Sequence, residues 1–263
     1  MKLFFRKSGN GPSLLILHGL YGSSDNWVTI AKMLSGKFTV YLPDLRNHGQ
    51  SPHSQQHDYD SMSQDILELA DELSLDRFIL AGHSMGGKVA VDFARKWPER
   101  IYSLVIIDIF PFEKADPDLQ IYREHMHILG SMLSLDLKKA AGRADIERML
   151  MGKIDDEKIR NLILKNLKRL PDNTFEWKVD AMSLYNNLDN IASGLEDPLP
   201  GEIITGFPVL FIKGERSVYL EEEDMKKIRQ LFPGAEMTVI KDAGHWVHAE
   251  QPEKAAGIFL SLL

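Results

Sequence analysis

Cysteine is absent from the 263-residue sequence. Its absence excludes disulfide bonds, thiolate metal sites and a cysteine nucleophile, and it is typical of the reducing cytoplasm, which is the location we expect. An excess of positive charge is also lacking, because 38 acidic residues outweigh 31 basic ones and the formal net charge is -7. Binding to nucleic acid or to an anionic membrane surface requires a basic face, so we expect neither as a partner.

Long apolar runs are missing as well. The longest runs near the N-terminus are residues 3–5 and 14–17, which are far shorter than a signal-peptide core or a membrane span. We therefore expect no export signal and no membrane anchor. A chain of this length is sufficient for one large domain with an insertion, and the choice between a monomer and a homodimer stays open.

Short apolar runs alternate along the chain with segments of helical spacing. One helix is predicted from the apolar residues between Met62 and Leu73, behind a capping box of Ser61 and Gln64. The alternation predicts an α/β protein with a doubly wound, mostly parallel sheet, whose active site lies at the carboxyl ends of the strands. The predicted strands are residues 14–17, 38–42, 78–81, 104–107, 209–212 and 237–240.

This alternation stops between about residues 112 and 194. No strand-like run appears there, and helical periodicity with many charges takes over. Residues 206–208, Gly-Phe-Pro, mark the point where the sheet resumes. We therefore predict a helical cap over residues 112–194, inserted into a core made of residues 1–111 and 195–263.

The motif with the clearest chemistry is Gly-His-Ser-Met-Gly at residues 82–86, which matches G-x-S-x-G. It follows a predicted strand and precedes a predicted amphipathic helix, and this context is much rarer than the motif alone. A nucleophilic serine must project above the sheet from a strained turn, so the residues two positions away on either side must lack side chains. Gly82 and Gly86 meet that need, and Ser84 is the candidate nucleophile.

A serine hydroxyl needs a base to accept its proton during attack. His245 follows the last predicted strand, so it lies on a loop at the catalytic edge and comes last in chain order. The other histidines lie on earlier loops, beside the nucleophile or in the predicted cap. His248 would suggest a metal pair with His245, but no third ligand has metal spacing, and we expect no metal and no cofactor.

The oxyanion formed by attack on an acyl carbonyl needs preorganised donors, which are usually backbone N–H groups. One candidate is the amide of Met85, directly after the nucleophile. The other lies in the turn after the first predicted strand, His-Gly-Leu-Tyr-Gly at residues 18–22, where Leu20 is the best candidate donor. The same turn also has a structural role as a tight turn, and the two roles are compatible.

The acid that orients His245 is less obvious. Hydrolases with this kind of elbow commonly have an aspartate three residues after a glycine that follows the penultimate strand, but Ser217 stands there after Gly214. A serine can hydrogen bond an imidazole but carries no charge to stabilise an imidazolium. Asp108 is the leading candidate because it ends a neighbouring strand. Glu215 and Asp242 remain as rivals.

Several longer motifs carry a resemblance to a known family. On these motifs the chain resembles the YbfF-type esterases, a bacterial family of α/β-hydrolases, and the resemblance covers nearly the whole length. They are His-Gly-Leu-Tyr-Gly at 18–22, Pro-Asp-Leu-Arg-Asn-His-Gly-Gln-Ser at 43–51, Gly-His-Ser-Met-Gly-Gly-Lys at 82–88, Ile-Asp-Ile at 107–109 and Ala-Gly-His-Trp-Val-His-Ala-Glu at 243–250.

The resemblance implies an α/β-hydrolase fold and a triad of Ser84, Asp108 and His245, with the aspartate after strand six, together with a serine near the histidine, here Ser217. It also implies activity on short-chain esters and acyl-CoA thioesters.

The sequence departs from the family in the region of the substrate pocket. Phe110 and Phe112 occupy positions that are often smaller or more polar, and Asp180 stands where an asparagine is expected.

These observations predict a carboxylesterase that acts on a small-molecule ester or thioester by two-step acyl transfer. Phe110, Phe112, Trp177 and Met182 are predicted to enclose the acyl group, although such residues equally suit packing within the cap. Carbon–carbon bond hydrolysis or perhydrolysis would use the same triad. A non-catalytic ligand-binding member of the fold is a further alternative, which the intact Ser84 and His245 argue against.

Overall fold

A computed structural model describes residues 1–113 and 119–262 of the chain. Its centre is a sheet with strand order β1-β3-β2-β4-β5-β8-β9, in which β1 is antiparallel to β3 and the other pairs are parallel. The strands are β1 (Phe5–Ser8), β2 (Ser13–Leu17), β3 (Thr39–Pro43), β4 (Phe78–His83), β5 (Ile101–Ile107), β8 (Val209–Gly214) and β9 (Ala235–Ile240). The prediction of a doubly wound, mostly parallel sheet is therefore confirmed.

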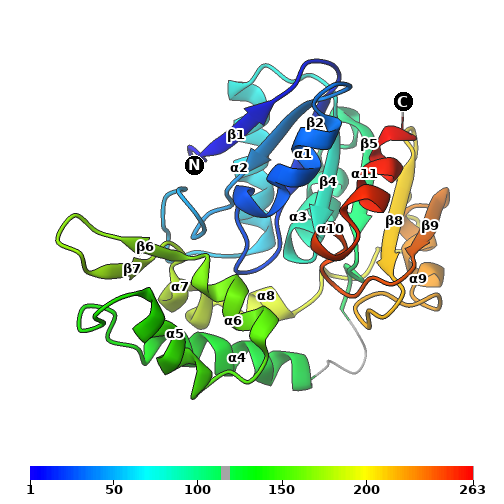
Figure 1. The fold of residues 1–263 in the computed structure, drawn as a ribbon. Helices are drawn as coiled ribbons and strands as arrows, with labels where there is room; N and C mark the ends of the chain where they lie inside the picture. Colours follow the sequence, from blue (N-terminus) through cyan, green and yellow to red (C-terminus); the bar gives the residue numbers. More distant parts are fainter. Residues whose placement is uncertain (114–118, 263) are drawn as a thin grey trace.

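Helices cover both faces of this sheet (Figure 1). Alternate residues of β2 show why, since Leu14 and Ile16 pack with α1 and α11 while Leu15 and Leu17 pack with α2 and α3. Both faces are thus apolar, as a buried parallel strand requires. The helices of the core are α1 (Val28–Leu34), α2 (Tyr59–Glu72), α3 (Met85–Lys96), α9 (Met225–Leu231), α10 (Val247–Glu250) and α11 (Pro252–Leu260), with 3₁₀ turns η1 (Ser24–Trp27) and η2 (Pro98–Arg100).

Residues between β5 and β8 form a separate layer of mainly helical elements. Figure 1 shows this layer below the sheet, on the side toward which β8 points. Its elements are α4 (Leu119–Leu133), α5 (Arg143–Met151), α6 (Glu157–Leu164), β6 (Leu167–Arg169), β7 (Phe175–Trp177), α7 (Ala181–Asn186) and α8 (Leu188–Ala192). No helix within residues 1–113 and 119–262 combines the length and the apolar character needed to cross a membrane.

Three local expectations from the sequence are wrong. β6 and β7 form an antiparallel hairpin where no strand was predicted. Each strand has only three residues, which is too few to show the alternation of apolar and polar residues that indicates a strand. Edge strand β1 was also missed, since its Arg6 and Lys7 interrupt any apolar run. Helix α2 begins before the predicted capping box: the Asp58 carboxylate accepts a hydrogen bond from the Ser61 amide at 2.7 Å, so Asp58 is the N-cap.

Candidate active site

Ser84 occupies the sharp turn between β4 and α3. Its backbone has φ 53° and ψ -120°, a strained conformation for a residue with a side chain. The turn is held in place because the Ser84 amide donates to the Ile107 carbonyl at 3.0 Å. A Cβ atom on Gly82 would lie 2.1 Å from the Gly86 carbonyl oxygen, and one on Gly86 would lie 2.6 Å from the His18 carbonyl oxygen. Both positions therefore exclude any side chain, in agreement with the sequence argument.

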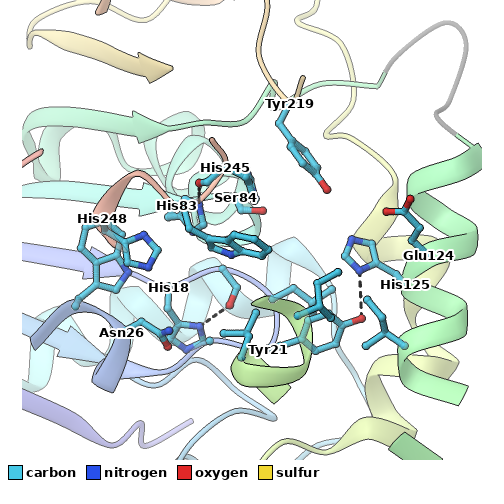
Figure 2. A pocket seen from close by; sticks show the side chains of 18 residues that line it. His18, Tyr21, Asn26, His83, Ser84, Glu124, His125, Tyr219, His245 and His248 are labelled. Carbon is cyan, nitrogen blue, oxygen red and sulfur yellow. Dashed lines mark hydrogen bonds between the residues drawn. The ribbon is translucent and has the colours of Figure 1, made fainter. Parts of the chain in front are cut away.

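His245 lies in the loop between β9 and α10 and faces the carboxyl ends of the strands. Its Nδ1 lies 2.7 Å from Asp108 Oδ2, and its ring stacks on Tyr219 with centroids 4.0 Å apart. Since Nδ1–H donates to the carboxylate, Nε2 is the nitrogen available to accept a proton. Ser84 and His245 line the same cavity (Figure 2). Within the described part of the chain the Ser84 hydroxyl forms no hydrogen bond, which is common for catalytic contacts without substrate.

Asp108 directly follows β5 and is fully buried, with 0% of its side chain exposed. One carboxylate oxygen accepts the Gly214 amide at 2.7 Å, and the other accepts both His245 Nδ1 and the Ser217 hydroxyl. Three donors therefore satisfy the hydrogen-bonding capacity of this buried carboxylate. The rival acids lie elsewhere, since Glu215 accepts the backbone amide of Asp242. Asp108 is thus the carboxylate that contacts His245.

Ser217 contacts the acid and not the imidazole. Its hydroxyl donates to Asp108 Oδ2, the same oxygen that accepts His245 Nδ1, so Ser217 lies near the histidine, as the resemblance implies, but contacts it only through the acid. The reason lies in the loop after β8, where the Ser217 amide bonds the Gly214 carbonyl at 2.9 Å and turns the side chain toward β5. Buried Lys213, which the sequence did not suggest as a site residue, fixes this loop by donating to the Ser217 carbonyl at 2.8 Å.

The predicted oxyanion donors lie beside Ser84. Leu20 and Met85 both line a cavity that Ser84 also lines. Within the residues the structure describes, their backbone N–H groups donate no hydrogen bond. The turn that carries Leu20 is held by His18, whose Nδ1 lies 2.9 Å from the Gly19 carbonyl and whose Nε2 accepts the Leu45 amide at 2.9 Å. Leu20 and Met85 therefore combine two unengaged N–H groups with a place in the wall of a cavity that Ser84 shares.

Two cavities meet at Ser84, with volumes of about 720 Å³ and about 200 Å³. They share Leu20, Ser84, His125 and Tyr219 as lining residues. Figure 2 shows the His125 ring directed at the Tyr21 hydroxyl, with a distance of 3.2 Å from its Nδ1. Sequence reasoning missed both His125 and Tyr219 as lining residues. For His125 the available signal was its helical spacing with Ile121, which lines the larger cavity, and with Ile128, which lines the smaller one.

The predicted substrate-contacting residues divide into two pairs. Phe110 and Phe112 line the larger cavity. Trp177 and Met182 line neither cavity, so their assignment to the substrate pocket is corrected here. The indole N–H of Trp177 donates to the Met132 carbonyl at 3.2 Å, which fixes it within the helical layer, and Met182 is 53% exposed on α7.

Several histidines around the site are buried and neutral. Burial lowers the pKa of each below the ordinary value of 6.5, and for His248, whose ring stacks on Trp27 at 4.5 Å, the pKa falls to about 3. The same cause lowers the pKa of His18 and His125 to about 4 and that of His48 and His57 to about 3.

These pKa values predict that the fold loses stability in mild acid. The unfolded chain takes up protons below pH 6.5 whereas the folded chain does not until about pH 4, so the stability is complete above pH 6.5 and falls as the pH decreases below it. Each such histidine reduces the free energy of unfolding by about 1.4 kcal/mol per pH unit in that interval. Melting temperatures measured from pH 7.5 to 4.5 are expected to fall steeply below pH 6.5, and less steeply in His57→Gln. A constant melting temperature down to pH 5 would contradict this.

The sequence of this chain is similar to those of known proteins along most of its length. Residues 12–252 match the model of the alpha/beta hydrolase fold family. The chain belongs to the α/β-hydrolase fold family. This hydrolase is 34% identical over 252 residues to the sn-1-specific diacylglycerol lipase ABHD11 of Danio rerio, covering 94% of this chain and 77% of the relative. It is 30% identical over 244 residues to esterase YbfF of Escherichia coli, and the match covers 93% of this chain and 90% of the relative.

A solved structure named as a marine microorganism esterase is also similar to this hydrolase. The two share 39% identity and a TM-score of 0.94, with 100% of this chain and 99% of that chain covered. The resemblance to YbfF-type esterases and the prediction of an esterase-type hydrolase are thereby confirmed. The roles of the individual site residues stay predictions.

Proposed function

We propose that this hydrolase cleaves carboxylic esters through a covalent acyl-enzyme on Ser84. The observation that carries the proposal is the contact of buried Asp108 with half-buried His245, whose Oδ2 and Nδ1 lie 2.7 Å apart, because this histidine lines the cavity that Ser84 also lines. A nucleophile on a strained elbow, a base oriented by an acid and a pair of unengaged amides are the parts that acyl transfer requires. The names of the relatives, esterase and lipase, favour an ester over other substrates of this fold.

In the first step Ser84 Oγ attacks the ester carbonyl carbon while its proton passes to His245 Nε2. The negative charge that develops on the carbonyl oxygen is stabilised by the N–H groups of Leu20 and Met85. The carbon–oxygen bond to the alcohol then breaks as His245 returns the proton to the leaving oxygen. The ionised Asp108 stabilises the imidazolium that exists between these two transfers.

The second step repeats this chemistry with water as the nucleophile. Water attacks the acyl-enzyme carbonyl and gives its proton to His245, and the bond to Ser84 Oγ breaks as that oxygen recovers a proton. The products are a carboxylic acid and free enzyme. A thioester would follow the same steps with a thiol as the leaving group.

We also propose that residues 112–194 act as a cap on a catalytic core formed by residues 1–111 and 195–263. Helix α4 supplies His125 to both cavities at Ser84, and α8 supplies Ile191 and Ala192 to the larger one. Because these side chains form walls of the cavities, the helical layer is suited to enclose the substrate and to exclude water from it.

A fluorophosphonate probe tests the proposed function directly. We expect it to label one serine in each chain, with the adduct mapped by peptide mass spectrometry to Ser84, and we expect hydrolysis of a p-nitrophenyl ester to fall in proportion to labelling. The reason is that the probe reacts with a serine only when a base and an oxyanion hole activate it. Labelling at another residue, or ester hydrolysis that survives complete labelling, would overturn the proposal.

A further inference from the structure

The two cavities at Ser84 differ in size and in the catalytic groups that they contain. The larger one, of about 720 Å³, is lined by Met85 but not by His245. The smaller one, of about 200 Å³, is lined by His245 and Trp246 but not by Met85. The candidate oxyanion donor Met85 and the candidate base His245 therefore line different cavities, and Ser84 lines both.

The chemistry of acyl transfer assigns a part of the substrate to each side. The base must protonate the leaving oxygen, so the alcohol has to lie within reach of His245. The acyl group extends from the same carbonyl carbon away from that base. In this site the alcohol accordingly faces the smaller cavity and the acyl group faces the larger one.

The walls of the larger cavity suit an apolar group. Phe110 and Phe112 pack edge to face with ring centroids 5.7 Å apart, and Ile109 and Ile121 line the same space. Two charged groups in the wall have partners within the protein: Lys88 donates to the Ser193 carbonyl at 2.8 Å, and Asp189 accepts the Tyr122 hydroxyl at 2.8 Å. Its volume lies within the range of about 300–1,000 Å³ that is usual for small-molecule sites.

The smaller cavity limits the alcohol. An apolar cavity of about 150 Å³ holds one benzene molecule, so about 200 Å³ admits an alcohol of similar size and not a long chain. Trp27 and His248, which are buried and stack on each other with ring centroids 4.5 Å apart, form part of its wall.

Resting on the proposed function, we propose that this hydrolase selects esters that join a large apolar acyl group to a small alcohol. The larger cavity is the acyl site and the smaller cavity is the alcohol site. Esters with the opposite distribution, a short acyl group on a long alcohol, are poor substrates although they contain the same atoms.

Two isomeric esters test this selection in the wild-type protein. Methyl nonanoate and octyl acetate have one composition but opposite distributions of carbon about the ester group. A single methylene in an apolar pocket changes kcat/KM by about tenfold or more. We therefore expect methyl nonanoate to be hydrolysed with a kcat/KM at least about tenfold higher, measured by titration of released acid. Equal values, or a preference for octyl acetate, would overturn the selection.

A pair of variants locates the selection in the two cavities. Ala192 is an exposed residue that lines only the larger cavity, and Ile159 is a half-buried residue that lines only the smaller one. The measured quantity is the kcat/KM for methyl nonanoate divided by that for octyl acetate. Ala192→Phe fills the larger cavity and is expected to lower this ratio about tenfold. Ile159→Phe fills the smaller cavity and is expected to raise it. Shifts in the reverse directions would exchange the acyl and alcohol sites and overturn the proposal.

Fluorophosphonate labelling separates the failure of this inference from the failure of the proposed function. If Ser84 is labelled and both isomers are hydrolysed without preference, only the division of the cavities is wrong. If Ser84 is not labelled and neither isomer is hydrolysed, the proposed function itself is wrong.

Discussion

Replacement of Ser84 by alanine is expected to reduce the kcat for ester hydrolysis by up to about a millionfold. The variant lacks the oxygen that forms the acyl-enzyme, while the amides of Leu20 and Met85 remain in place. Residual activity above the rate in water is expected from these donors and from substrate binding. The measurement is kcat and KM with a p-nitrophenyl ester, combined with loss of fluorophosphonate labelling.

The double variant Ser84→Ala/His245→Ala makes this prediction sharper. Because nucleophile and base act as a unit, removing His245 as well should lower kcat little further. Ser261→Ala is the matched control, since Ser261 is the C-cap residue of α11 and lines neither cavity. Melting temperatures should confirm that each variant is folded. Undiminished labelling of the folded Ser84→Ala variant would place the nucleophile elsewhere in the chain.

Local steric rules explain why the sheet and the elbow could be predicted from the sequence. The central strands are buried on both faces and so appear as short apolar runs, as in β2 and β4. The glycines at 82 and 86 are required by close contacts with the first turn of α3 and with the end of β2, respectively. Edge strand β1 obeys no such rule, because its side chains are partly exposed and its pairing with β3 is what makes it a strand.

Contacts between distant loops explain what the sequence left undecided at the site. Asp108 directly follows β5, and this position made it the leading candidate for the acid, because neighbouring parallel strands end at the same edge of the sheet. The direction of the Ser217 hydroxyl depended on the loop after β8, which Lys213 and the Gly214 carbonyl hold in place. No spacing within the sequence reports that arrangement.

The residues of the helical layer that line the substrate pocket could not be predicted for the same reason. Its composition indicated apolar side chains but not which of them face Ser84. Trp177 turned inward to the Met132 carbonyl, whereas His125 of α4 reached both cavities. Packing between helices decides which face is directed at the site, and this depends on contacts far apart in the sequence.

Replacement of Asp108 by asparagine is expected to lower kcat by on the order of 10⁴-fold. The carboxylate accepts His245 Nδ1–H at 2.7 Å and leaves Nε2 free to accept the serine proton. An asparagine amide that donates to Nδ1 instead would favour the tautomer with the proton on Nε2, which cannot act as the base. The charge that stabilises the imidazolium is lost at the same time. KM should change little, because Asp108 lines neither cavity.

Two control variants decide whether Asp108 is the acid. Ser217→Ala removes one of the three donors to the carboxylate and should cost at most about 100-fold, since a hydrogen bond to a charged group contributes about 1.5–3 kcal/mol. Glu215→Gln removes a rival carboxylate whose partner is the Asp242 amide, and it should leave kcat almost unchanged. If either control lost more activity than Asp108→Asn while all three proteins kept their melting temperature, the charge beside His245 would not be the group that orients it.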